Sequence, residues 1–146
     1  MKKSSAFWDA SALVPLCVQE SGTASAEALL RKFPPVVWWG SPVEIRSAIC
    51  RLHREKRVTD LGKKGAVMRL ELLHRASKEI LPGDALRDLA FGLLDVYSLR
   101  AADSFQLAAA LIWCDGRPAR RNFICADQKL TRAAASAGFT VFELFG

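Results

Sequence analysis

The chain has 146 residues, of which 51% are hydrophobic and 25% are charged. This fits one globular domain with a sizeable core and excludes a disordered or fibrous protein, and no apolar stretch approaches the roughly 20 uncharged residues of a membrane helix. The net charge of +6 comes from the segment between Arg46 and Lys78, which holds ten Lys and Arg residues against three acids.

Short apolar segments alternate with helical patterns along the chain. The sequence predicts strands at residues 5–9, 36–39, 78–81, 122–127 and 139–144. Helices are predicted at residues 24–33, from 41 through at least 52, and at 60–77, 84–97, 102–114 and 128–138. Ser41 is the expected N-cap of the second helix and Pro42 its first residue. Strands that alternate with helices predict an α/β fold with a mostly parallel sheet of about five strands, covered on both faces.

In such a sheet, functional sites form beyond the carboxyl ends of the strands. Asp9 and Asp127 each end a predicted strand, and Asp9 lies between two apolar runs. An ionised carboxylate in that setting needs a partner, because burying it alone is costly. Glu44 and Asp103 begin two of the predicted helices. We therefore expect these four acids to converge at one edge of the sheet.

Each acid except Asp9 also has an ordinary structural explanation. Glu44 could form a capping box with Ser41, Asp103 could be a first-turn acid that the helix dipole stabilises, and Asp127 could be an N-cap. As a group, the four acids are not explained by helix capping alone, since two carboxylates about 5 Å apart repel by about 3 kcal/mol at an effective dielectric of 20. Such a cluster needs a bound cation, and ligands that are all oxygen favour Mg²⁺ or Mn²⁺.

The remaining candidate ligands indicate no second site. Four cysteines are scattered along the chain: Cys17, Cys50, Cys114 and Cys125. They include no C-x-x-C pair, so we expect free thiols in a reducing cytoplasm. His53 and His74 have the polar, basic surroundings of surface residues. The basic start of the chain is followed by an apolar run that Asp9 interrupts, without a small-residue cleavage site, so no signal peptide is expected.

The acids lie in four sequence motifs that are spread along essentially the whole chain: FWDASALV, SPVEIRSAI, LRAADSFQLAAAL and FICADQKLTRAAASAGFTVF. In order and spacing these resemble the acidic motifs of PIN-domain ribonucleases, and most of all those of VapC-type toxins of bacterial toxin–antitoxin operons. The resemblance implies a PIN-like three-layer α/β/α fold. It also implies that Asp9, Glu44, Asp103 and Asp127 hold the metal, and that Ser11 positions Asp9 or a metal-bound water. Cys125 departs from the pattern, because relatives often have Ser or Thr there.

The function implied by the resemblance is that of a cytoplasmic endoribonuclease, the toxin of a type II toxin–antitoxin pair. It would cleave structured RNA such as tRNA or rRNA by metal-activated water. Its partners would be an antitoxin protein and a second copy of the chain. The basic segment, with Arg46, Arg54, Lys56 and Arg57, is expected to hold RNA backbone beside the acidic pocket. The alternatives are a solvated helical face for this segment and, for the protein, an inactive PIN-fold module that binds RNA.

Overall fold

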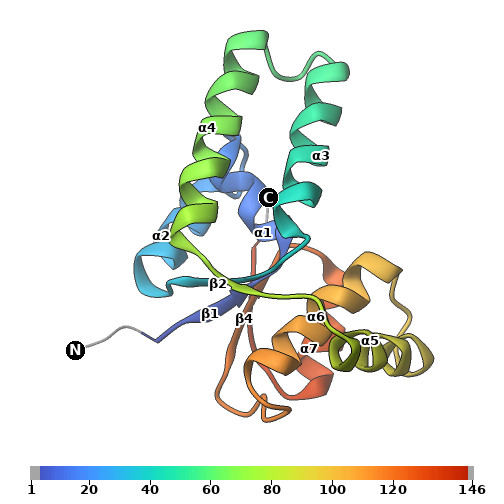
Figure 1. Ribbon diagram of the computed structural model, residues 1–146. Coiled ribbons are helices and arrows are strands. Elements are labelled where there is room, and N and C mark those ends of the chain that lie inside the picture. Colours follow the sequence, from blue (N-terminus) through green and yellow to red (C-terminus); the bar gives the residue numbers. More distant parts are fainter. Residues whose placement is uncertain (1–3, 145–146) are drawn as a thin grey trace.

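A five-stranded sheet runs through the middle of the protein (Figure 1). The computed structural model describes residues 4–144. The strands are β1 (Ala6–Trp8), β2 (Pro35–Trp38), β3 (Lys78–Ile80), β4 (Asn122–Cys125) and β5 (Thr140–Glu143). Their order is β3-β2-β1-β4-β5, and every neighbouring pair is parallel. The predicted α/β class and five parallel strands are therefore confirmed.

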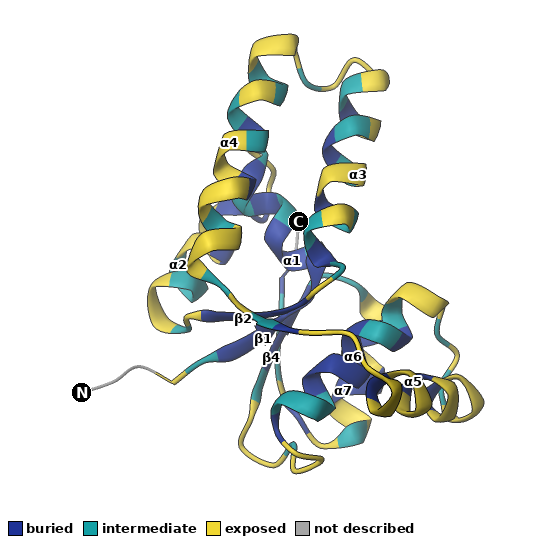
Figure 2. Cartoon of the chain, viewed as in Figure 1, coloured by how far each residue is buried: buried dark blue, intermediate teal, exposed yellow. Residues whose placement is uncertain are grey.

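Helices cover both faces of the sheet. One layer holds α1 (Ala10–Cys17), α2 (Thr23–Lys32), α3 (Ser41–Arg54) and α4 (Asp60–Ala76), and the other holds α5 (Asp84–Val96), α6 (Ala101–Trp113) and α7 (Gln128–Ala137). Side chains alternate across β1, since Phe7 packs with the α5–α7 layer while Ala6 and Trp8 pack with the α1–α4 layer. The central strands are buried on both faces (Figure 2), as a covered parallel sheet requires.

Helix α1 is an element that the sequence pattern did not predict. Its residues are almost all apolar, so they show no helical period, and Pro15 lies inside the helix. The other predicted strands and helices are confirmed, with ends that differ by one or two residues. Gly138 ends α7 in the left-handed conformation with φ of 116°, as expected of a C-terminal glycine.

The predicted start of α3 is wrong by one residue. Gly40 is the N-cap, and Ser41 is the first residue of the helix rather than its cap. The Ser41 side chain is fully buried and accepts a hydrogen bond from Gln106 on α6, so the proposed capping box with Glu44 does not form.

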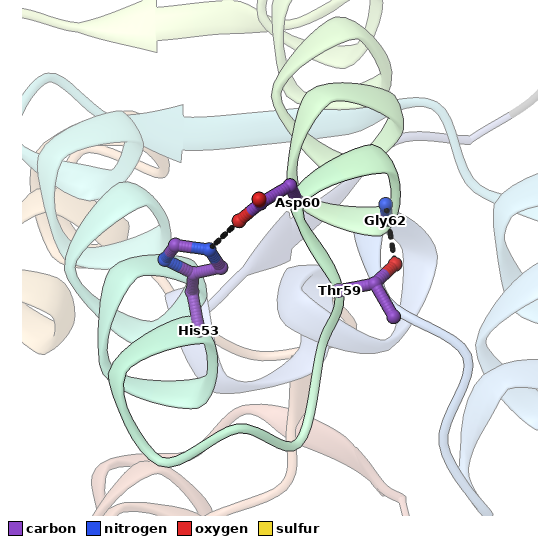
Figure 3. Close-up of polar contacts among 4 residues, drawn as sticks. All are labelled: His53, Thr59, Asp60 and Gly62. Atoms are coloured by element: carbon purple, nitrogen blue, oxygen red, sulfur yellow. Dashed lines mark hydrogen bonds and ion pairs between the residues drawn. The ribbon is translucent and has the colours of Figure 1, made fainter.

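Helices α3 and α4 form a hairpin that extends away from the sheet (Figure 1). Its outward residues are largely exposed (Figure 2), and it carries most of the basic segment. The tip is held by the His53 Nε2–Asp60 Oδ1 contact at 2.6 Å and by the N-cap bond from Gly62 N–H to Thr59 Oγ1 at 3.0 Å (Figure 3). His53 and His74 both pair with nearby acids at the surface. None of the helices within residues 4–144 has the length and apolarity needed to cross a membrane.

Candidate functional site

Asp9 lies where β1 ends and α1 begins. Its backbone N–H donates to the Ile124 carbonyl at 2.9 Å, which continues the pairing of β1 with β4. Its side chain caps α1 by accepting from the Ser11 N–H at 3.0 Å, and it also accepts from the Ser11 hydroxyl. Only 5% of Asp9 is exposed. The partner that a buried carboxylate requires is thus a neutral serine, and the charge itself is not balanced by this contact.

Ser11 also ties α1 to the end of β4. Its Oγ accepts from the Ala126 N–H at 2.9 Å, so the same hydroxyl contacts both the acid after β1 and the backbone after β4. Cys125 Sγ lies 3.8 Å from Asp9 Oδ2 and 3.3 Å from the Asp127 nitrogen. Burial raises the pKa of Cys125 to about 12, so this residue is a neutral thiol beneath the acids. Ser11 thus donates to Asp9 from both its N–H and its hydroxyl, and its role in positioning Asp9 or a metal-bound water stays a prediction.

Glu44 is oriented by a residue that the sequence reasoning missed. Gln106 Nε2 donates to Glu44 Oε2 at 2.6 Å and to Ser41 Oγ at 2.9 Å, and Gln106 is fully buried. A signal was present in the sequence, since Gln106 follows Asp103 by three residues and therefore lies on the same side of the helix. Helix α6 thus supplies one acid of the site and the amide that positions another.

Asp103 and Asp127 begin helices, and the structural explanations for both are confirmed. Asp103, in the first turn of α6, accepts from the Arg100 N–H at 3.4 Å. Asp127 is the N-cap of α7 and accepts from the Leu130 N–H at 3.1 Å. Capping does not remove either acid from the site, because each has a second carboxylate oxygen.

The four acids form one electrostatic group. The pKa of Asp9 is raised to about 6, mainly by burial and to a smaller extent by the charges of Asp103 and Asp127, even though the hydrogen bonds from Ser11 oppose the shift. Burial also raises the pKa of Glu44 to about 7, with smaller contributions from Asp9 and Asp103. For Asp103 the pKa is raised by burial and by Asp127, while Arg100 and Lys129 oppose this shift. Like charges thus add to burial in raising the pKa of each of these three acids.

Three of the acids, Glu44, Asp103 and Asp127, line an open cleft of about 760 Å³. Its basic residues are Arg100, Lys129 and Arg132, which come from the start of α6 and from α7. The prediction named none of them. The predicted RNA-contacting residues lie elsewhere, since Arg46 lines hollows between α3 and α4, and the hollow at the hairpin tip is lined by residues that include Arg54, Lys56 and Arg57. None of these hollows shares a lining residue with the acidic cleft, and the role of the basic segment in holding RNA beside the acids stays a prediction.

The donor set of this site fits a hard divalent cation. Its ligand atoms are carboxylate oxygens, and none of the ion pairs located among the described residues includes one of the four acids. Within residues 4–144, however, no three His, Cys, Asp or Glu side chains already surround one metal position. Each acid is turned toward a hydrogen-bond donor of the protein, as described above.

The fold is shared with solved structures at low sequence identity. A chain of a toxin–antitoxin complex from Klebsiella pneumoniae matches with a TM-score of 0.67 and 18% identity, over 96% of this chain and 100% of that chain. PAE2754 from Pyrobaculum aerophilum gives a TM-score of 0.64 at 14% identity, over 96% and 89% of the two chains. FitAcB from Neisseria gonorrhoeae gives 0.63 at 13% identity, over 94% and 96%.

Neither a family model nor a curated protein matches the sequence. The likeness to solved structures spans nearly the whole length of each chain and includes the sheet and both helical layers. At such low identity it establishes architecture and leaves activity to be argued from the site. The chain therefore has the PIN-like three-layer α/β/α fold.

Proposed function

We propose that this protein is a metal-dependent endoribonuclease that hydrolyses phosphodiester bonds in structured RNA such as tRNA or rRNA. One observation carries the proposal. Four acids from separate segments of the chain lie at the carboxyl edge of a parallel sheet, where three of them line one open cleft and Asp9 is close enough to Asp103 and Asp127 for their charges to raise its pKa. Buried like charges are costly, so their convergence favours a site that works with a cation.

Asp9, Glu44, Asp103 and Asp127 would hold the cation, Mg²⁺ or Mn²⁺. Such an ion supplies charge neutralisation at the phosphodiester and activation of water. The protein's own part is to hold its acids in place. Ser11 fixes the carboxylate of Asp9, and fixing a ligand in this way is typically important for metal affinity.

Gln106 does the same for Glu44 from the buried side of α6. At the rim of the cleft, Arg100 and Lys129 oppose the negative charge that would otherwise repel a phosphate. The acids are thereby oriented from beneath, and the substrate is attracted from the rim.

We further propose that the enzyme is the toxin of a type II pair and that an antitoxin protein holds it inactive in the cytoplasm. Support comes from the shared fold with a chain of a toxin–antitoxin complex. The acidic cleft would accept an Arg or Lys side chain from an inhibitor, and a disordered segment that folds on contact could present one.

A homodimer formed through apolar helices is part of the same proposal. Support comes from large apolar side chains at the surface of α4 and α5, where Met68 is 64%, Phe91 59% and Val96 73% exposed. Exposed side chains of this size are common at protein interfaces. Light scattering of the purified protein across a concentration series tests this, and a monomer at all concentrations would contradict it.

The decisive experiment is cleavage of labelled tRNA and rRNA by the purified protein, with Mg²⁺, with Mn²⁺ and with excess EDTA. The wild type should cleave only with a metal. The variant Asp103→Asn should be inactive, while Asp95→Asn, which changes an exposed acid of α5, should cleave normally. Undiminished cleavage in EDTA or by Asp103→Asn would refute the proposal. RNA binding without cleavage under every condition would instead identify an inactive RNA-binding module.

A further inference from the structure

A groove continues from the acidic cleft along the outside of α7. A second hollow, of about 400 Å³, shares four lining residues with the cleft: Ser98, Leu99, Lys129 and Arg132. Beyond these it is lined by Tyr97 and by the next turn of α7, with Ala133 and Ser136. The two hollows therefore form one groove, called here the α7 groove, between residues 97–100 and the side of α7 that carries Lys129, Arg132, Ala133 and Ser136.

Helix geometry sets the length of this groove. Lys129, Arg132, Ala133 and Ser136 follow the spacing i, i+3, i+4, i+7, which places them along one side of α7. From Lys129 to Ser136 the helix rises by about 10 Å at 1.5 Å per residue. The groove is therefore long enough for a chain that extends beyond a single phosphate group.

The chemistry of the groove changes in an orderly way along its length. The acids stand at one end, and two exposed cations, Lys129 and Arg132, come next. Neither takes part in the ion pairs found among residues 4–144. The far end is apolar and aromatic, because Tyr97 and Leu99 pack against the core on one side and line the groove on the other.

We propose that the α7 groove binds the single-stranded stretch of RNA that leaves the cleavage site, with a phosphate on Lys129 and Arg132 and a base against Tyr97. The inference rests on the proposed function and identifies the surface along which the RNA substrate would lie. Paired cations followed by an aromatic ring are how proteins follow single-stranded nucleic acid. Neither Arg46 nor the basic residues of the hairpin tip line a hollow that shares a residue with the acidic cleft.

The test uses the full chain made inactive by Asp103→Asn, with a fluorescent single-stranded RNA titrated at several salt concentrations. Three double variants each remove two positive charges: Lys129→Gln with Arg132→Gln, Arg54→Gln with Lys56→Gln, and Arg117→Gln with Arg120→Gln. The last pair is the matched control, because it lies in the exposed loop before β4, at the opposite end of the strands from the acids.

The α7 pair should weaken binding about tenfold or more and reduce the salt slope by about 0.7, the contribution of one phosphate contact to a single strand. The control pair should change the affinity less than about twofold, as expected from net charge alone. Equal losses in all three pairs, or the largest loss in the hairpin pair, would overturn the inference.

Tyr97 supplies a second test, because Phe keeps the ring and Leu does not. Tyr97→Phe should bind RNA as the wild type does, whereas Tyr97→Leu should bind about five- to a hundredfold more weakly. Thermal melting checks that both variants are folded. Equal affinities of two folded variants would refute stacking on this residue.

Two further readouts separate this inference from the proposed function. If the wild type cleaves RNA with metal while the α7 pair binds and cleaves normally, the groove inference fails and the function stands. If no RNA is cleaved but binding depends on the α7 pair, the function fails and the groove stands. Competition by polyglutamate as strong as that by RNA would indicate an acidic protein segment in the groove and overturn the inference.

Discussion

Replacing Asp9 with Asn should stabilise the metal-free protein at pH 8, even though it destroys the proposed metal site. Asp9 is buried and its pKa is raised from 3.8 to about 6, mainly by burial. The native protein therefore binds more protons than the unfolded chain between these values, and the free energy of unfolding falls as the pH rises through this window. Above about pH 6 the whole cost of the buried charge is present.

The magnitude follows from the size of the shift. A difference of about 2 pKa units corresponds to about 3 kcal/mol, at 1.36 kcal/mol per unit. Asn can still accept from the Ser11 N–H and hydroxyl, but its own amide N–H group is left without an evident partner, which costs about 1 kcal/mol. The variant should thus be about 2 kcal/mol more stable than the wild type at pH 8. Near pH 4 it should be about 1 kcal/mol less stable.

Urea denaturation from pH 4 to pH 8 in EDTA measures this difference, with tryptophan fluorescence as the signal. Trp8, which is fully buried beside Asp9, is one of the four tryptophans that contribute to this signal. The variant Asp95→Asn, which changes an exposed acid, is the control. Its free energy of unfolding should stay within about 0.5 kcal/mol of the wild-type value at every pH. With Mg²⁺ at a hundredfold excess over its Kd, the wild type alone should gain about 2.7 kcal/mol.

Two results would refute the reasoning. One is a difference between Asp9→Asn and the wild type that does not change with pH, since the gain is attributed to the carboxylate charge. The other is an equal gain from Mg²⁺ in the variant, because Asp9 is proposed to hold the ion. Either result would show that the negative charge at this edge of the sheet is balanced in another way.

Three other predictions concern the site and its partners. Gln106→Leu should raise the Mg²⁺ concentration for half-maximal cleavage about 10- to 100-fold, and an unchanged metal titration would show that this amide does not orient Glu44. Reversing the charges of Arg54, Lys56 and Arg57 should weaken RNA binding and flatten its salt dependence, and wild-type values would make the hairpin a solvated face. Expression of the protein alone should arrest growth and co-expression with the adjacent small open reading frame should restore it, whereas harmless expression of active enzyme would exclude an antitoxin.

Much of the fold could be predicted because its strands are short, apolar and separated by amphipathic helices. Helix α1 could not, because an apolar run that contains Pro15 has no period to indicate a helix. The start of α3 was placed one residue late for a different reason. Ser41 has the side chain of an N-cap, but its hydroxyl is used by Gln106 in the tertiary structure, and this long-range contact leaves no local signal.

Acids at strand ends were visible in the sequence, because strand ends can be predicted and parallel strands bring them to one edge. The basic residues that lie near these acids in the structure cannot be identified from the sequence in this way. Lys129 and Arg132 are only two cations in a short helix, whereas the ten Lys and Arg residues of the basic segment stand out in a charge count. Which cations face the acids depends on how α7 lies against residues 97–100, and that is a property of packing alone.

The pairing of β1 with β4 determines when the site can exist during synthesis of the protein. The hydrogen bond from the Ala126 N–H to Ser11 joins residues that are 115 positions apart in the sequence. This bond and the pairing of β1 with β4 bring Asp127 close to Asp9. A growing chain that has left the ribosome as far as α6 therefore has three of the acids but no β4 to complete the group. Closing so long a loop is slow compared with forming a helix. The acidic cleft thus comes into being only after β4 has been synthesised, when the residues before it have already become available for binding by other proteins.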